Sequence, residues 1–257
     1  NPVLRAETLE HYSQVTFNDE GLQLKGDRLI EYLKGHDKAI TALETIDASV
    51  LSQLPELKVI AKYGVGLDMV DLEAMRASGK RLGWTGGVNR RSVAELVIAF
   101  AIAMLRHIPA AHREILDGTW RQQVGGYLTG RTVGIIGCGH VGKDLVTLLK
   151  AFQCPILVHD IRDYPEFFAE HNIETTELDT LLQRSDIVTL HVPLDSTTRG
   201  ILSVDKLALM KPDAVLINTA RGELVDETAL KKKLQEGRFI ILWVQEKQKE
   251  HLIGFLR

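Results

Sequence analysis

The chain is poor in the features that mark secreted, membrane-spanning or nucleic-acid-binding proteins. It has two cysteines, Cys138 and Cys154, in 257 residues, which argues against a disulfide framework and is typical of a reducing compartment. Its longest uncharged apolar run, Leu96 to Leu105, is about half of the length that crosses a bilayer. The formal net charge of −3 gives no electrostatic basis for binding nucleic acid. We therefore expect a cytoplasmic protein without membrane or nucleic-acid partners.

Metal-ligand spacings and targeting signals are also missing. The nine histidines and two cysteines form no spacing of the H-x-x-x-H or C-x-x-C kind, so we expect no metal site. No secretory signal opens the sequence. Apolar residues make up 45% of the chain and charged residues 25%, which is enough for one large or two medium globular cores.

What the sequence does contain is a glycine-rich turn between a strand and a helix. Thr132 to Ile136 is a short β-branched run, and Lys143 to Phe152 has leucines at helical spacing. Between them lies the pattern Gly137-x-Gly139-x-x-Gly142, and a second apolar run ends at Asp160, about 20 residues later. This context predicts a dinucleotide-binding βαβ unit. The alternative is an ordinary βαβ unit whose turn happens to be rich in glycine.

Each position of the motif has a physical reason in a dinucleotide fold. Gly137 permits a tight turn, Gly139 lets the backbone approach a pyrophosphate, and Gly142 lets the helix pack closely on the strand. The N–H groups of the helix N-terminus favour the phosphates. Asp160 would accept hydrogen bonds from ribose hydroxyls and repel a 2′-phosphate, so NAD is expected over NADP, although Arg162 would soften that repulsion.

Short strands alternate with helices before the glycine turn, from Val15 to about Gly87, and this alternation predicts a parallel sheet. The expected strands are Val15–Phe17, Ala39–Leu43, Leu57–Ala61 and Arg81–Trp84, and the expected helices are Gly26–Leu33, Ala48–Leu54 and Leu72–Ala77. Thr85 to Asn89 is a natural hinge. We expect an incomplete substrate domain over residues 1–88, because no strand precedes Leu4, and a dinucleotide-binding domain over residues 89–239.

The second half contains two strands whose ends carry polar residues, Asp186–Pro193 and Ala214–Gly222. In open parallel sheets ligands bind at that edge. The helix from Val93 to Arg106 is apolar nearly all round, so it must be buried in the fold or in a partner subunit. Residues 240–257 show no strand–loop–helix continuation, and we expect an atypical tail.

Five motifs occur in order, and together they carry a resemblance to a known family. They are Tyr63–Asp68, Asn89–Glu95, Gly137–Gly142 with Asp160, His191–Leu194 and Asn218–Asp226. With them the chain resembles the D-isomer-specific 2-hydroxyacid dehydrogenases from roughly residue 13 to residue 239. The resemblance implies an α/β protein with two doubly wound parallel-sheet domains, a flavodoxin-like substrate domain and a Rossmann NAD-binding domain. It implies NAD-dependent oxidation of a D-2-hydroxy acid, or reduction of a 2-oxo acid, by a homodimer paired through Val93–Leu105.

The family resemblance also implies which residues form the site. Arg221 would bind the substrate carboxylate and polarise the carbonyl, since a guanidinium offers paired donors. Val65, Gly66 and Asn89 would face the substrate, with the Gly64–Gly66 backbone as an anion nest. His191 would border the cofactor without being the catalytic histidine. The implied cofactor-binding residues are Gly137, Gly139, His140, Val141, Gly142, Asp160, Val192, Pro193, Thr219, Ala220 and Arg221.

The chain departs from the family pattern after Phe239. In the family a glutamate and a histidine follow the arginine and relay the proton, and no matching segment occurs here. Glu246 and His251 are too close together and too near the arginine to match the relay. We therefore expect that this chain lacks the proton relay and ends like a truncated product. The alternative functions are an NAD-binding protein without catalysis and a corepressor-like binding module.

Overall fold

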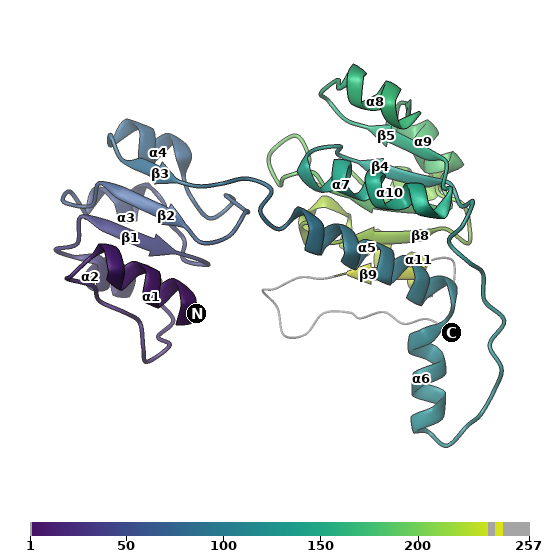
Figure 1. Ribbon diagram of the computed structural model, residues 1–257, viewed down its shortest axis with the longest axis horizontal. Helices are drawn as coiled ribbons and strands as arrows, with labels where there is room; N and C mark the ends of the chain where they lie inside the picture. The colour runs from purple at the N-terminus through teal and green to yellow at the C-terminus, as the bar shows by residue number, and fades with distance from the viewer. Residues whose placement is uncertain (1, 236–239, 244–257) are drawn as a thin grey trace. The chain divides into compact units, whose positions relative to one another are not determined.

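The computed structural model describes residues 2–235 and 240–243. The chain divides into two compact units, one ending at Trp84 and one beginning at Thr85. In Figure 1 the first unit runs from purple to blue and the second from teal to yellow.

The first unit is built on a small parallel sheet in the order β1-β2-β3. Its strands are β1 Lys38–Thr41, β2 Val59–Lys62 and β3 Arg81–Gly83. Its helices are α1 Pro2–His11, α2 Asp27–Leu33, α3 Ala48–Ser52 and α4 Leu72–Ala77. Asp47 and Asp71 cap α3 and α4 through the backbone N–H groups of Val50 and Ala74. The core of this unit is a cluster of buried aliphatic side chains that includes Leu29, Ile46, Leu57 and Ile60.

One expectation for this unit was wrong, and one of its helices was not predicted. Residues Val15–Phe17 form no strand, and α1 is a helix that the sequence did not predict. The apolar run at Val15–Phe17 has no neighbouring strand to pair with, and the Phe17 ring instead contacts the guanidinium of Arg5 at 4.0 Å. No residue of α1 is buried, so its sequence has no apolar stripe from which a helix could be predicted. Good helix formers such as leucine, alanine and glutamate explain why the segment is helical.

The second unit is a six-stranded parallel sheet in the order β6-β5-β4-β7-β8-β9. The strands are β4 Val133–Ile136, β5 Ile156–His159, β6 Glu174–Thr175, β7 Ile187–Leu190, β8 Val215–Asn218 and β9 Ile240–Trp243. This order places β4 between β5 and β7, where the direction of winding reverses. With its flanking helices the sheet confirms the predicted α/β fold of the dinucleotide-binding type.

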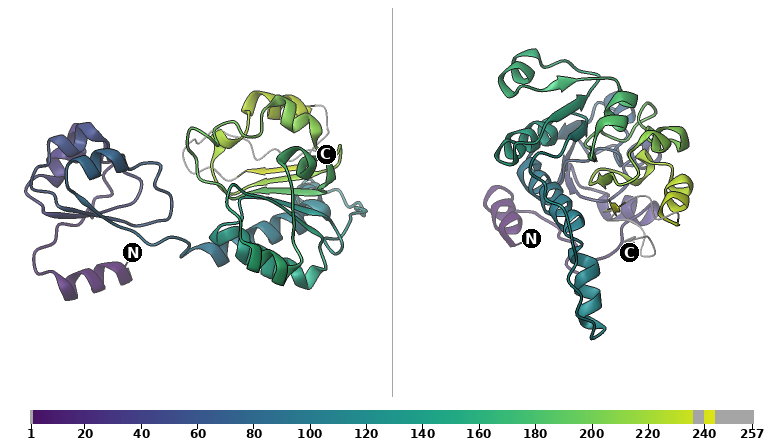
Figure 2. Two further views of the ribbon diagram at one scale, coloured as in Figure 1. Left: turned by 90° about the horizontal axis from the view of Figure 1, so that it is seen from above. Right: turned by 90° about the vertical axis from the view of Figure 1, so that its right-hand side faces the viewer.

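Helices cover both faces of this sheet (Figures 1 and 2). The helical elements are α5 Arg90–Leu105, α6 Ile108–Leu116, α7 His140–Leu149, η1 Lys150–Phe152, α8 Pro165–His171, α9 Leu178–Arg184, α10 Val204–Leu209, η2 Gly222–Leu224 and α11 Glu227–Gln235. One core cluster joins the sheet to α5, α7 and α8, and another joins it to α9, α10 and α11. Every residue of β4, β7 and β8 is therefore buried, which explains their continuous apolar sequences.

The apolar helix expected near residue 93 is α5, and one side of it enters the core. Ala94, Val97, Ala101 and Met104 are buried, and α5 packs mainly on α7. At His107 the backbone adopts a left-handed conformation and α6 leaves at a bend of 62°. Figure 1 shows α6 projecting away from the sheet, with the following segment returning beside it. Among the described residues no single helix meets the length and hydropathy of a bilayer span, whereas the bent α5–α6 pair meets them jointly.

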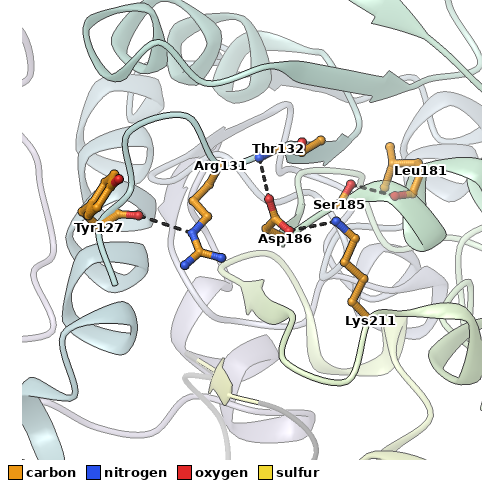
Figure 3. Close-up of polar contacts among 7 residues, drawn as sticks. All are labelled: Tyr127, Arg131, Thr132, Leu181, Ser185, Asp186 and Lys211. Atoms are coloured by element: carbon orange, nitrogen blue, oxygen red, sulfur yellow. Dashed lines mark hydrogen bonds and ion pairs between the residues drawn. The ribbon is translucent and has the colours of Figure 1, made fainter. Parts of the chain in front are cut away.

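A half-buried carboxylate joins the amino ends of three strands (Figure 3). Asp186, just before β7, accepts hydrogen bonds from the Thr132 backbone N–H and from Lys211 Nζ, each at 2.8 Å. Burial raises the pKa of Asp186, but the bonds from Lys211 and Thr132 outweigh it, and the net pKa is lowered. Asp186 therefore stays charged and fixes the starts of β4, β7 and β8 against one another.

The expectation of a tail without a strand was also wrong. Residues Ile240–Trp243 form β9, which pairs in parallel with β8 so that Val215 lies opposite Ile240. The sequence Ile-Ile-Leu-Trp has high strand propensity, and without β9 the buried strand β8 would have an open edge. Residues 244–257, including Glu246 and His251, lie outside the described residues.

Candidate active site

The glycine turn lies where β4 passes into α7. Gly137 has a φ of +95°, which side-chain-bearing residues rarely adopt, and a Cβ on it would lie 2.8 Å from the carbonyl of His191. A Cβ on Gly142 would lie 2.4 Å from the Gly137 carbonyl oxygen, so only glycine allows α7 this close to β4. The roles predicted for these two glycines, a tight turn and close packing, match this geometry.

The same turn leaves room for an anion at the start of α7. A Cβ placed on Gly139 would meet no atom within 4 Å, so this side of the turn is open. Gly139 is the N-cap of the ten-residue helix α7 and offers no capping side chain to the N–H groups of the first turn, where His140 and Val141 lie. The predicted pyrophosphate-binding residues therefore present uncapped donors on an open side, which fits a dinucleotide phosphate.

Asp160 is held against the turn by backbone donors. Directly after β5, its Oδ2 accepts from the Cys138 N–H at 2.6 Å and its Oδ1 accepts from the Arg162 N–H at 2.8 Å. An ionised carboxylate has about four lone-pair sites, so acceptor capacity for two ribose hydroxyls remains. This anchoring of Asp160 to the glycine turn was not predicted, because nothing in the sequence specifies a bond between a turn N–H and a residue on the next strand.

Cys138 lies inside the turn as a neutral thiol. Burial, followed by the charge of Asp160, raises the pKa of Cys138 to about 12. A thiol with such a pKa is not a nucleophile at neutral pH. Cys138 therefore contributes packing to the turn rather than redox chemistry.

His191, Val192 and Pro193 follow β7, beside the turn. The His191 backbone N–H donates to the Ile136 carbonyl at 2.7 Å, and its ring Nε2 lies 3.0 Å from Thr189 Oγ1. A Cβ on Gly137 would also touch Val192 Cγ1, so the turn packs directly on this segment. Burial lowers the pKa of His191 to about 4, and the ring is neutral at pH 7. The hydrogen bond between His191 and Thr189 was not predicted, since nothing in the sequence indicates that a threonine inside a strand bonds to a histidine at its end.

Arg221 lies in the turn that follows β8. Its Nη1 donates to the Ala220 carbonyl at 2.9 Å, and its backbone is extended. Thr219 Oγ1 is buried and has no hydrogen-bond partner among the described residues. An unsatisfied buried hydroxyl at this edge fits a residue that bonds to a ligand.

Strand order gathers most of the expected cofactor residues along one edge. Asp160, the glycine turn, His191 and Arg221 follow β5, β4, β7 and β8, which are neighbours in that order, all parallel. Ligands of open parallel sheets bind at the carboxyl ends of the strands where winding reverses, which here is β4. No group of three or more potential metal ligands occurs among residues 2–235 and 240–243.

The expected substrate residues are divided between the units. Val65 and Gly66 follow β2 in the first unit, where the Val65 carbonyl accepts from Trp84 Nε1 at 3.0 Å and Gly64 has a φ of +131°. Asn89 is the N-cap residue of α5 in the second unit, where its carbonyl accepts from Ser92 Oγ. The anion nest at Gly64–Gly66 stays a prediction.

Comparison with known proteins decides the family. The sequence profile of the D-isomer specific 2-hydroxyacid dehydrogenase NAD binding domain matches residues 98–247, more than half of the chain. The chain belongs to the D-isomer specific 2-hydroxyacid dehydrogenases. The family resemblance read from the five motifs is thereby confirmed, and the second unit is an NAD-binding domain.

Relatives and solved structures agree with this family. A glyoxylate reductase of Thermofilum pendens is 37% identical over 219 residues, which are 82% of this chain and 65% of that protein. A D-3-phosphoglycerate dehydrogenase of Mycobacterium tuberculosis is 36% identical over 200 residues, 77% of this chain and 38% of that protein. A D-lactate dehydrogenase from Aquifex aeolicus, solved with NAD and lactic acid, superposes with a TM-score of 0.81 at 26% identity over 92% of this chain and 71% of that one. The chain thus spans less than two thirds of the length of both relatives.

The buried neutral histidine generates a prediction about acid stability. Because the folded pKa of His191 is about 4 and the unfolded value about 6.5, the unfolded chain binds a proton more readily between these values. The stability that neutral His191 retains at pH 7 is lost as the pH falls from about 6.5 towards 4. His191→Gln keeps a polar partner for Thr189 without this titration. Between pH 7 and 4.5 the free energy of unfolding should fall by about 2 kcal/mol less in His191→Gln than in the unmodified chain, measured by urea denaturation. Equal losses in both chains would show that His191 titrates normally.

Proposed function

We propose that this chain forms part of an NAD-dependent oxidoreductase that acts on the CH–OH group of a D-2-hydroxy acid and, in reverse, reduces a 2-oxo acid. The observation that carries the proposal is Arg221 at the carboxyl end of β8, on the sheet edge that also holds the glycine turn and Asp160. An NAD-binding edge with a cation is what a reaction on an anionic hydroxy acid requires.

The chemistry divides into three tasks. The glycine turn and Asp160 would hold NAD, which would supply the hydride acceptor for the carbon that carries the hydroxyl. Arg221 binds the carboxylate and polarises the developing carbonyl, because its planar guanidinium donates two parallel hydrogen bonds. A base takes the hydroxyl proton, and His191 does not fill that role, since its Nε2 is engaged by Thr189 and burial holds its pKa near 4. Glu246 and His251, whose spacing does not match the family's proton relay, lie outside the described residues.

The substrate class we favour is a small 2-oxo or 2-hydroxy acid. The relatives are named glyoxylate reductase, hydroxypyruvate reductase and D-3-phosphoglycerate dehydrogenase. The substrates in these names share a carboxylate beside the reacting carbon, which is the group that Arg221 would hold. The Gly64–Gly66 backbone is proposed to assist as an anion nest.

We also propose a cytoplasmic location. Cys138 and Cys154 are both free, one buried and one half-buried. Free thiols persist in a reducing compartment, which supports the expectation drawn from the sequence.

A homodimer is proposed on the α5–α6 region. The segment from α6 to Tyr127 exposes large apolar side chains, among them Leu116 at 72%, Trp120 at 87% and Val124 at 89%. Several large exposed apolar side chains on one segment favour an interaction site there. Glu114 bonds to Arg121 and Gln123, which holds α6 and the returning segment together and keeps these side chains displayed. A second copy of the same chain is the proposed partner.

The first prediction of this proposal concerns cofactor choice. Asp160→Ser should weaken NADH binding, because the serine hydroxyl replaces a charged acceptor for the ribose hydroxyls, and should narrow the preference for NADH over NADPH. The loss should be on the order of tenfold in Kd, as expected for a charged hydrogen bond, measured by fluorescence titration. Asp163→Ser, three residues away, is the control. Tighter binding of NADPH than of NADH by the unmodified chain would overturn the assignment.

The second prediction concerns Arg221. We would fuse the carboxyl-terminal segment of the Thermofilum pendens glyoxylate reductase to residues 1–239 and assay glyoxylate, hydroxypyruvate and pyruvate with NADH. Arg221→Lys should lower kcat/KM by roughly 10- to 100-fold, because lysine keeps the charge but loses the paired donors, while the Kd for NADH changes little. Full activity of Arg221→Lys would show that Arg221 does not bind the substrate carboxylate. A fused chain that binds NADH but reduces none of the acids would favour the non-catalytic or corepressor-like alternatives.

The third prediction concerns the dimer. The unmodified chain should sediment as a dimer, and Leu116→Glu or Trp120→Glu should yield monomers, because each places a charge in the shared apolar surface. Val204→Glu is the matched control, since Val204 is 56% exposed but lies on α10. Sedimentation velocity distinguishes the species. A soluble monomer of the unmodified chain would contradict the proposed interface.

A further inference from the structure

A buried side-chain amide lies next to Arg221, the residue proposed to bind the substrate carboxylate. Asn218 is the last residue of β8, and its side chain is only 2% exposed. Its Oδ1 accepts a hydrogen bond from the Ala220 N–H at 3.0 Å, and its Nδ2 donates to the Arg221 carbonyl at 2.8 Å. The orientation of the amide is fixed by chemistry, since the oxygen must face the N–H and the nitrogen must face the carbonyl.

These two bonds close the turn that presents Arg221. A bond from an Asn side chain to the backbone N–H two residues later is an Asx turn, and here the same side chain also holds the carbonyl three residues later. One side chain thereby holds the peptide groups on both sides of the Ala220–Arg221 peptide. Arg221 Nη1 donates to the Ala220 carbonyl, so the position of the guanidinium also depends on the Ala220–Arg221 peptide.

The neighbouring polar side chain does not share the task. Thr219 Oγ1 has no hydrogen-bond partner among the described residues, so it does not brace the turn. The backbone adds a bond of 3.3 Å from the Leu224 N–H to the Arg221 carbonyl. Asn218 supplies the two shorter bonds, and it does so from a rigid buried strand.

We propose that Asn218 is a positioning residue for Arg221: its carboxamide sets the backbone from which the guanidinium reaches a substrate carboxylate. The inference rests on the proposed function of Arg221 and adds a residue that acts through it. Asn218 does not touch the substrate. It fixes the direction of the Arg221 guanidinium. Two parallel hydrogen bonds from a guanidinium to a carboxylate tolerate little misalignment.

Two substitutions divide the contribution of the amide. Asn218→Asp is isosteric and keeps the acceptor for Ala220, but it turns a carboxylate oxygen towards the Arg221 carbonyl, where two oxygens repel. Asn218→Ser leaves only a shorter hydroxyl, which bonds more weakly to the Ala220 N–H and cannot reach the Arg221 carbonyl. Ser185→Ala is the matched control, since it removes a buried side-chain bond to Leu181, of 2.6 Å, at the opposite edge of the same sheet (Figure 3).

The experiment measures the turn and the clamp separately on the whole chain. Hydrogen exchange followed by NMR reports the protection of the Ala220 amide, and calorimetry with NADH present reports the binding of oxalate, a small analogue of a 2-oxo acid. In Asn218→Asp we expect at least a tenfold rise in the oxalate Kd, with the NADH Kd changed by less than threefold. In Asn218→Ser we expect faster Ala220 exchange and a smaller loss of oxalate binding. Ser185→Ala should leave both readouts unchanged.

A double-mutant cycle separates positioning from general damage. If Asn218 acts through Arg221, then Asn218→Asp should weaken oxalate binding no further once Arg221→Lys is present. Additive losses, or unchanged oxalate binding in Asn218→Asp, would overturn the positioning role while leaving Arg221 as the clamp. Failure of the unmodified chain to bind oxalate would contradict the proposed function itself, and the positioning role would fall with it.

Discussion

The close approach of α7 to β4 is the constraint on which the site depends. A Cβ on Gly142 would lie only 2.4 Å from the Gly137 carbonyl oxygen, so the first turn of the helix packs directly on the end of the strand. Any larger residue would lift the helix and move its N–H groups away from the sheet edge. The packing of α7 on β4 thus determines where an anion can bind. The contact between Gly142 and Gly137 serves both folding and cofactor recognition.

The rest of the edge follows from strand order. β4 is central, with β5 on one side and β7 and β8 on the other, and the polar residues that follow β5, β7 and β8 are each held by a hydrogen bond to a nearby group. Asp160 is held by the glycine turn, His191 by Thr189, and the Arg221 turn by Asn218. At the other end of the strands Asp186 joins Thr132 and Lys211, which keeps β4, β7 and β8 in register.

The sequence predicted the parts that local pattern determines. The glycine spacing located the turn and α7, and the expected helix Leu72–Ala77 is α4. It did not predict α1, which buries no residue and so has no apolar stripe, or β9, which is defined by pairing with β8 rather than by its own length. The bond of Asp160 to Cys138 was also beyond prediction, because it depends on which strand ends become neighbours in space.

Titration of the uniformly labelled chain with NADH, followed by the backbone amide resonances, tests most directly whether this edge binds the dinucleotide. The account predicts that the largest shifts occur at Gly139 to Val141, at Cys138 and Arg162 beside the Asp160 carboxylate, and at Thr219 to Arg221. These groups follow three parallel strands of one sheet, β4, β5 and β8, so they should respond together with a single Kd. Shifts confined to the first unit, or to the amino ends of the strands around Asp186, would contradict it.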